Sequence, residues 1–367
     1  MAGDRFCEVC GADLRVHRGS PTTVNTGACP GCGHPPPPDA DGWCPTCGLS
    51  RPDAADHVET GVDGGAGISD RGHARPRNED AVAVGRVGSG AADEPERVAA
   101  AVCDGVSSTR SSELAARAAA DAALLVLLRG PGPRPFRPSR LATRNVAPEA
   151  TPVEEASGER PFRPSRLATR NVALEATPVE EASGERGIRS AVAAAAAAAA
   201  ALVPRGTPQP PSCTLVCAVH DVPGGVLTVG WVGDSRAYWL AEPGAAEPAR
   251  LLSADHTAEA AAAAGTLDPA VAAIRPDAIT RWLGADGDAE PEVVALTPGG
   301  PGALLLCTDG LWKYLPDAAA LAAVALPALS LGGAPAAAAA LTAAALAAGG
   351  ADNVTVAVLP VPLTEEP

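Results

Sequence analysis

The chain has 367 residues, a formal net charge of −15 and a pI of about 4.8. Nucleic-acid backbones and anionic membrane surfaces attract clustered cations, so this acidic balance argues against both as partners. No apolar run reaches the roughly 20 residues of a membrane span without a charge, proline or glycine, and we identify the alanine stretch 193–201 as the longest. The first residues form no apolar signal region, so we expect a cytoplasmic protein whose ten cysteines are thiols or metal ligands.

Six of the ten cysteines lie within residues 1–50, as three CxxC pairs that are each followed by glycine. Such pairs are typical of zinc knuckles, because glycine lets backbone amides face the thiolates. Four thiolates complete one tetrahedral zinc site. The compact spacing of the later pairs predicts a small zinc-ribbon module with the ligands Cys29, Cys32, Cys44 and Cys47.

The first pair, Cys7 and Cys10, leaves three interpretations open. It is half of a second ribbon completed by His17 and His34, it pairs with the second CxxC pair instead, or it has lost an upstream partner through a wrongly assigned start codon. Residues 1–50 hold three arginines, no lysine and five acidic residues, which argues against nucleic-acid binding. We therefore interpret this segment as a structural or protein-docking module.

A folded domain is predicted at 61–359, after a short acidic linker at 51–60, because apolar runs there alternate with Gly/Asp turns. It is interrupted at 134–185 by a tandem repeat of 26 residues whose two copies differ only at Pro148 and Leu174. Each copy is rich in proline and charge and has no periodic apolar face, so it cannot offset the entropy of ordering. We expect a disordered surface insertion between two helices, where a long loop does least damage.

The predicted helices lie on either side of this insertion. Ser111 or Ser112, followed by Glu113, can cap a helix that ends near Leu128, and an alanine-rich helix covers 188–203. Short runs rich in β-branched residues predict strands at 81–87, 98–103, 213–219, 226–232, 236–240, 303–307 and 354–359. The runs joined by the Gly-Asp-Ser turn at 233–235 are expected to pair as a hairpin. Many strands with few helices favour an α+β fold over a parallel α/β sheet.

Five aspartates stand at the ends of these strands. Asp104, Asp234 and Asp309 follow predicted strands, whereas Asp80 and Asp352 precede them. In an antiparallel sheet the end of one strand lies beside the start of its neighbour, so all five side chains can gather at one rim. An Asp-Gly pair on its own is commonly a turn, but the ordered set predicts a cation site. Oxygen-only ligands favour Mg²⁺ or Mn²⁺ over zinc.

Six motifs in a fixed order carry a family resemblance. They are SDRGHARPRNEDA at 69–81, VCDGVSS at 102–108, SCTLV at 212–216, VGDSRAYWL at 232–240, LLLCTDGLW at 304–312 and GGADNVTV at 349–356. The set resembles the metal-dependent PPM-type protein phosphatases, the protein phosphatase 2C family, and the bacterial branch most closely. The resemblance covers 61–359 apart from the repeat. It implies a four-layer α-β-β-α sandwich, two antiparallel sheets flanked by helices, with a binuclear metal centre at one end.

The resemblance also implies roles for individual residues. Metal ligands are implied at Asp80, Asp104, the carbonyl of Gly105, Asp234, Asp309 and Asp352. Among these, Asp80 would contact both metals and Asp234 would hold a third, weaker one.

Three further positions follow from the same motifs. Glu79 would orient bound water, and Arg75 matches the phosphate-binding arginine, although Arg71 and Arg77 lie close by. Val106 stands where some members carry a histidine general acid, which bacterial members commonly lack, so the acid stays unassigned.

The function implied is a Mn²⁺- or Mg²⁺-dependent phosphatase that hydrolyses phosphoserine and phosphothreonine in proteins through a metal-activated water. Its partners would be phosphoproteins and a Ser/Thr kinase system. Two other hypotheses stay open: a non-catalytic zinc-ribbon adaptor that binds phosphoproteins, and a metal hydrolase of other phosphoesters. The intact set of aspartates disfavours the adaptor, and the acidic charge disfavours nucleic-acid substrates.

Overall fold

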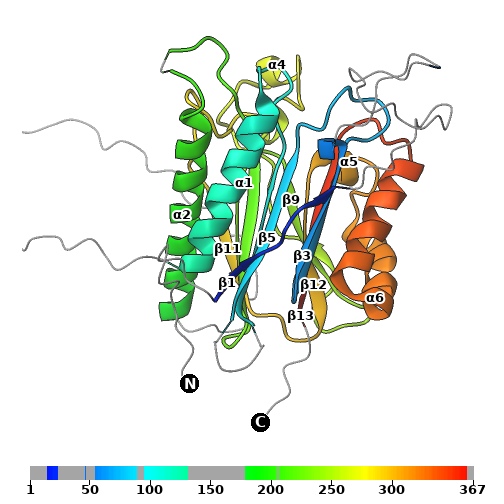
Figure 1. The fold of residues 1–367 in the computed structure, drawn as a ribbon. Coiled ribbons are helices and arrows are strands. Elements are labelled where there is room, and N and C mark those ends of the chain that lie inside the picture. The colour runs from blue at the N-terminus through cyan, green and yellow to red at the C-terminus, as the bar shows by residue number, and fades with distance from the viewer. Residues whose placement is uncertain are drawn as a thin grey trace, which may run out of the picture.

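The computed structural model describes residues 15–23, 46, 54–88, 95–130, 178–204 and 206–361. Within these residues, thirteen strands form two antiparallel sheets, and helices cover both outer faces (Figure 1). The predicted α+β sandwich is confirmed. The predicted zinc ligands lie outside the described residues and stay predictions: Cys7, Cys10, Cys29, Cys32, Cys44 and Cys47.

The six-stranded sheet has the order β1-β5-β6-β7-β8-β11. Its strands are β1 (Val16–Arg18), β5 (Ala81–Gly88), β6 (Pro95–Cys103), β7 (Leu215–Asp221), β8 (Val226–Val232) and β11 (Glu292–Leu296). Two helices, α1 (Ser112–Arg129) and α2 (Pro178–Ala200), cover its outer face. Strand β8 is buried at every position, because a sheet covered on both faces needs apolar residues throughout rather than in alternation.

The seven-stranded sheet has the order β10-β9-β12-β13-β4-β3-β2. Its strands are β2 (Thr22–Thr23), β3 (His57–Val62), β4 (Gly65–Asp70), β9 (Arg236–Leu240), β10 (Arg250–Leu251), β12 (Gly302–Cys307) and β13 (Val354–Val361). The long helix α6 (Ala318–Ala347) covers its outer face. The short helices are η1 (Ala54–Asp56), α3 (Ala258–Ala263), α4 (Pro269–Ala272) and α5 (Asp309–Trp312).

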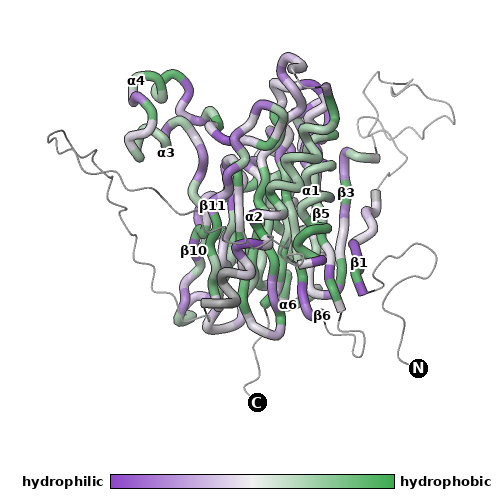
Figure 2. The backbone as a smooth tube through the Cα atoms, turned by 90° about the vertical axis from the view of Figure 1, so that its left-hand side faces the viewer, coloured by the Kyte–Doolittle hydropathy of each residue, from purple (hydrophilic) through white to green (hydrophobic). Residues whose placement is uncertain are grey.

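The apolar core has three layers, one between the sheets and one beneath each set of helices. Val82, Val102 and Leu306 are buried between the sheets, together with Trp239. The outer layers depend on alanine, whose small side chain lets helix and sheet approach closely, as at Ala119 of α1. Figure 2 shows this apolar interior, with α3 and α4 standing clear of the sandwich at one end.

The predicted hairpin across 233–235 is wrong, because its two strands belong to different sheets. Strand β8 pairs with β7 and β11, whereas β9 pairs with β12 and β10. The chain crosses between the sheets at Gly233, whose φ of 107° favours glycine. The crossing leaves Asp234 at the end of the sandwich rather than at the tip of a surface hairpin.

The predicted domain boundaries shift at three places. Strands β1 and β2, from the cysteine-rich segment, pair with β5 and β3 and so cover the same edge of both sheets. Residues 57–60 of the expected linker form the first part of β3. Residues 178–185 of the repeat are the first turns of α2, and the remainder of the repeat lies outside the described residues.

Helix α6 is long and apolar enough, by length and composition, to cross a membrane, and it is the one such helix among the described residues. Proline and glycine interrupt its apolar sequence at Pro327, Gly332, Gly333 and Pro335, so it holds no unbroken apolar run of the length of a membrane span. Leu321 and Leu341 of α6 are fully buried against the seven-stranded sheet. In this structure α6 is therefore a covering helix of the sandwich.

Candidate active site

Strand register brings the five aspartates to one rim of the sandwich. In the six-stranded sheet, Ala81 of β5 lies opposite Cys103 of β6, so the neighbouring Asp80 and Asp104 are adjacent. Both strands change into loop at this point, which leaves the carboxylates at the sheet end.

The seven-stranded sheet brings the other three aspartates to the same rim. Cys307 at the end of β12 lies opposite Val356 of β13 and Arg236 of β9. Asp309, Asp352 and Asp234 each lie within a few residues of these positions. The rim predicted from the sequence is present, with all of its aspartates.

The carboxylates at the rim are crowded and poorly solvated. Burial, with the charges of Asp309 and Asp352, raises the pKa of Asp80 to about 8, although hydrogen bonds from Thr355 and Thr308 oppose the shift. Burial and the charges of the other four aspartates raise the pKa of Asp104 well above its usual range. Without a cation, this end of the protein therefore holds protons at neutral pH.

Asp234 shows the same effect more weakly. Burial, then the charges of Asp309 and Asp255, raises its pKa to about 7. Its backbone carbonyl accepts a hydrogen bond of 3.0 Å from Trp312 Nε1, and Arg236 stacks 3.7 Å above the Trp312 ring while forming a two-pronged ion pair with Asp255. The Asp234 loop is therefore held rigidly against α5.

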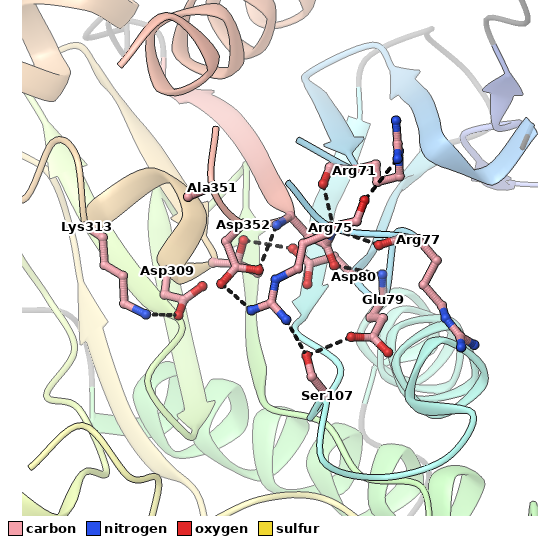
Figure 3. A network of polar contacts seen from close by, with 12 residues as sticks. Arg71, Arg75, Arg77, Glu79, Asp80, Ser107, Asp309, Lys313, Ala351 and Asp352 are labelled. Carbon is pink, nitrogen blue, oxygen red and sulfur yellow. Dashed lines mark hydrogen bonds and ion pairs between the residues drawn. The ribbon is translucent and has the colours of Figure 1, made fainter. Parts of the chain in front are cut away.

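Arg75 points into the rim, and its two neighbouring arginines do not. Its Nη2 donates to Asp352 Oδ2 at 2.6 Å and its Nη1 to Ser107 Oγ at 3.0 Å (Figure 3). Arg71 pairs with Asp56 at 3.3 Å, and Arg77 with Glu113 at 3.6 Å. Of the three arginines, Arg75 is therefore the one whose guanidinium lies at the rim.

Both carboxylate oxygens of Glu79 accept hydrogen bonds from serine. Ser107 Oγ donates at 2.7 Å and Ser112 Oγ at 2.9 Å. Neither Ser111 nor Ser112 caps α1 as predicted, because Ser111 has a left-handed backbone without a side-chain cap and Ser112 is turned towards Glu79. Gly105 lies between these groups and has no room for a side chain, since an added Cβ would stand 2.5 Å from Glu79 O.

Sequence reasoning missed one residue that shapes this loop, Asn353. Its side-chain amide donates to the carbonyls of Arg71 at 2.8 Å and Arg77 at 3.0 Å, and its Oδ1 accepts from Glu79 N at 2.9 Å. Asn353 thus closes the loop that carries Arg75. The only indication of this role in the sequence was the position of Asn353 directly after Asp352.

Lys313 was also missed, although it is the only lysine of the chain. Its Nζ lies 2.5 Å from Asp309 Oδ2, so a second cationic side chain stands at the rim, separate from Arg75.

The oxygen ligands at the rim suit a hard divalent cation, but their side chains are not arranged as a complete coordination site. Five carboxylates supply oxygen ligands only, and the pKa values of three of them, Asp80, Asp104 and Asp234, are raised, which is the chemistry of a Mg²⁺ or Mn²⁺ site. Among the described residues, however, no three acidic, histidine or cysteine side chains converge closely enough to hold one ion as they stand. Asp352 and Asp309 are instead paired with Arg75 and Lys313, and Asp80 accepts from Thr308 at 2.9 Å.

Comparison with known proteins agrees with this architecture. The family model for protein phosphatase 2C matches residues 73–344. A bacterial serine phosphatase structure is 18% identical, with a TM-score of 0.55 over 82% of this chain and 99% of that chain. The serine/threonine phosphatase Stp1 from Staphylococcus aureus is 19% identical, with a TM-score of 0.50 over 81% of this chain and 94% of that chain.

A third structure is that of the catalytic domain of the serine/threonine protein phosphatase PstP in complex with two manganese ions. It is 24% identical over 81% of this chain and 97% of that chain, with a TM-score of 0.47. No curated protein matches the chain in sequence. At these identities the bacterial serine phosphatase and Stp1 show a shared fold.

Proposed function

Because the chain belongs to the protein phosphatase 2C family, we propose that it is a metal-dependent phosphatase that hydrolyses phosphoserine and phosphothreonine in proteins. The observation that carries this proposal is the rim itself, where five aspartates from both sheets gather and Arg75 reaches one of them, Asp352. A cluster of carboxylates beside one guanidinium needs cations before it can admit a phosphorylated side chain.

We assign the cations Mn²⁺ or Mg²⁺ to the carboxylates of Asp80, Asp104, Asp309 and Asp352, with the carbonyl of Gly105. Asp234 is the position at which the resemblance implies a third, weaker ion. Bound there, they would supply an activated water for attack on phosphorus. Ionised Asp80 and Asp104 require such charge, because their pKa values are raised in its absence.

The side chains of the protein perform the remaining tasks. Arg75 has two nitrogens directed at the rim, and a planar guanidinium binds two phosphoryl oxygens at once. Asn353 holds the loop that positions Arg75, and the two serines hold Glu79 in place. Charge that develops on the phosphoryl oxygens is stabilised by groups already oriented, which lowers the barrier.

The remaining assignments are proposals of the same kind. We place the protein in a reducing compartment such as the cytoplasm, where it would oppose Ser/Thr kinases, and its described cysteines, all four free thiols, support this. The segment 1–50 is proposed to be a zinc-binding docking module on the basis of its cysteine spacing.

The decisive experiment measures hydrolysis of a phosphothreonine peptide with Mn²⁺, with EDTA and with the variant Asp309→Asn. We expect a metal-dependent rate that EDTA abolishes and that the variant lowers by about a hundredfold or more. The control is Asp63→Asn, an exposed aspartate in the β3–β4 turn at the opposite end of the sandwich, which should retain the rate. Equal, negligible rates in every arm would instead support a phosphoprotein-binding adaptor.

A further inference from the structure

Lys313 occupies a place at the rim that the proposed reaction does not explain. It follows α5, four residues after Asp309, and this spacing puts both side chains on one face of the helix. Its Nζ lies 2.5 Å from Asp309 Oδ2 (Figure 3), and the Lys313 side chain is 49% exposed, whereas that of Asp309 is 13% exposed.

The same ammonium also stands near Asp234. Trp312, the residue before Lys313, donates its indole N–H to the Asp234 carbonyl, which ties the Asp234 loop to the end of α5. The negative charges of Asp309, Asp234 and Asp352 all act on the Lys313 side chain. A lysine is ordinarily an ammonium ion at neutral pH.

The choice of lysine at this position is informative, because Lys313 is the only lysine and every other basic side chain, histidines apart, is arginine. A guanidinium is a flat, extended group that binds in a two-pronged fashion, as Arg236 does with Asp255. An ammonium is a compact, strongly hydrated point charge. Of the two, it resembles a metal ion more closely in size and hydration.

We propose that the ammonium of Lys313 is a resident cation of the rim that takes the place of one divalent ion between Asp309 and Asp234. This inference rests on the proposed function, since it concerns the charge balance of that same site. A tethered cation keeps part of the acidic rim neutralised at every metal concentration. The rim therefore holds one divalent ion fewer than its carboxylates would otherwise accept.

The test counts the Mn²⁺ ions bound by the full chain, with free Mn²⁺ followed by electron paramagnetic resonance after EDTA treatment and dialysis. We expect Lys313→Met, which keeps the length of the side chain and removes its charge, to bind one more Mn²⁺ than the unchanged chain. Lys313→Arg should keep the original number. The cysteine-rich segment is the same in all samples, so any ions that it binds cancel in the comparison.

The matched control is Arg189→Met on α2, which removes a cation from another pair with i,i+4 spacing, that of Arg189 with Glu185, outside the rim. This control should bind the same number of ions as the unchanged chain. Lys313→Gln repeats the test in case the methionine variant does not fold.

Each result has one meaning. Identical Mn²⁺ isotherms for the unchanged chain and Lys313→Met overturn the inference, and so does an additional ion in Lys313→Arg, because charge would then not be the cause. If either of these results is found while the phosphothreonine peptide is still hydrolysed in a metal-dependent manner, the proposed function remains supported and only the inference about Lys313 fails. If the unchanged chain binds no Mn²⁺, both the inference about Lys313 and the proposed metal-dependent function are overturned.

Discussion

Arg75 and Asp352 are 277 residues apart in the sequence, yet Arg75 Nη2 donates to Asp352 Oδ2 across 2.6 Å. This ion pair joins the loop after β4 to the start of β13, two neighbouring strands of the seven-stranded sheet. The guanidinium therefore has its position set by the same rim that we propose holds the cations. A phosphoryl group that enters the site would meet Arg75 already oriented.

Replacing Arg75 by alanine should lower kcat/KM for a phosphothreonine peptide by about 10²–10³-fold, because an oriented donor to the phosphoryl oxygens is lost. Arg75→Lys should recover only part of this loss, since an ammonium cannot make the two-pronged contact. Steady-state kinetics with saturating Mn²⁺ measures both. Arg77→Ala is the control, because Arg77 pairs with Glu113 instead of the rim. A larger effect of Arg77→Ala than of Arg75→Ala would contradict the assignment.

The metal-free protein should lose stability as the pH rises from about 4 to about 8. Asp80 has its pKa raised from 3.8 to about 8 and Asp234 from 3.8 to about 7, so the folded chain holds protons that the unfolded chain releases. For such groups the stabilisation is complete below the unfolded pKa and is lost as the pH rises through the folded pKa. Urea unfolding of EDTA-treated protein at several pH values measures this slope.

Two comparisons support the interpretation of that slope. Asp80→Asn should flatten it, because one of the titrating groups is removed. Added Mn²⁺ should raise the midpoint most at high pH, where the carboxylates are free to bind. Stability of the metal-free protein that increases between pH 5 and pH 8 would disagree with the raised pKa values.

Gly310→Ala should impair both folding and activity. A Cβ at this position would stand 1.9 Å from the backbone oxygen of Asn353, so β13 and the start of α5 could not keep their present separation. Overpacking of this kind costs about 1–3 kcal/mol or more, and here it also displaces Asp309 from Asp352. Thermal unfolding and peptide hydrolysis report the two effects. Gly88→Ala, where an added Cβ meets nothing within 4 Å, should leave both near their original values.

Two deletions, one contained within the other, should distinguish the contribution of the repeat to stability from that of the first turns of α2. Removing 134–177 leaves residues 130–133 to join α1 to α2, which pack side by side and run in opposite directions, so a short connection suffices. We expect activity and melting temperature to stay close to the original values.

Removing 134–185 also deletes the first turns of α2, where Gly184 lies against Thr228 of β8 and Glu185 pairs with Arg189. We expect a melting temperature lower by a few degrees, since each kcal/mol is worth about 2–4 °C in a domain of this size. Equal melting temperatures for the two deletions would show that these turns contribute nothing.

Several strands were recognisable from the sequence and several were not, for physical reasons. Each of the seven predicted runs became a strand, because both faces of these strands are buried and their apolar residues are continuous. Strands β3 and β4 were missed, since polar residues and glycines such as Gly65 and Gly67 obscure them. Gly67 is required by packing, as an added Cβ would stand 2.5 Å from a methyl of Val82 in the other sheet.

The sequence by itself determined which residues form the rim, because aspartates at strand ends follow from local patterns of apolar runs and turns. It also determined the α+β class. Only the tertiary structure decided that β8 and β9 belong to different sheets, that Arg75 rather than Arg71 or Arg77 faces the carboxylates, and that Lys313 neutralises Asp309. These facts depend on which distant segments become neighbours, and no local pattern of residues specifies them.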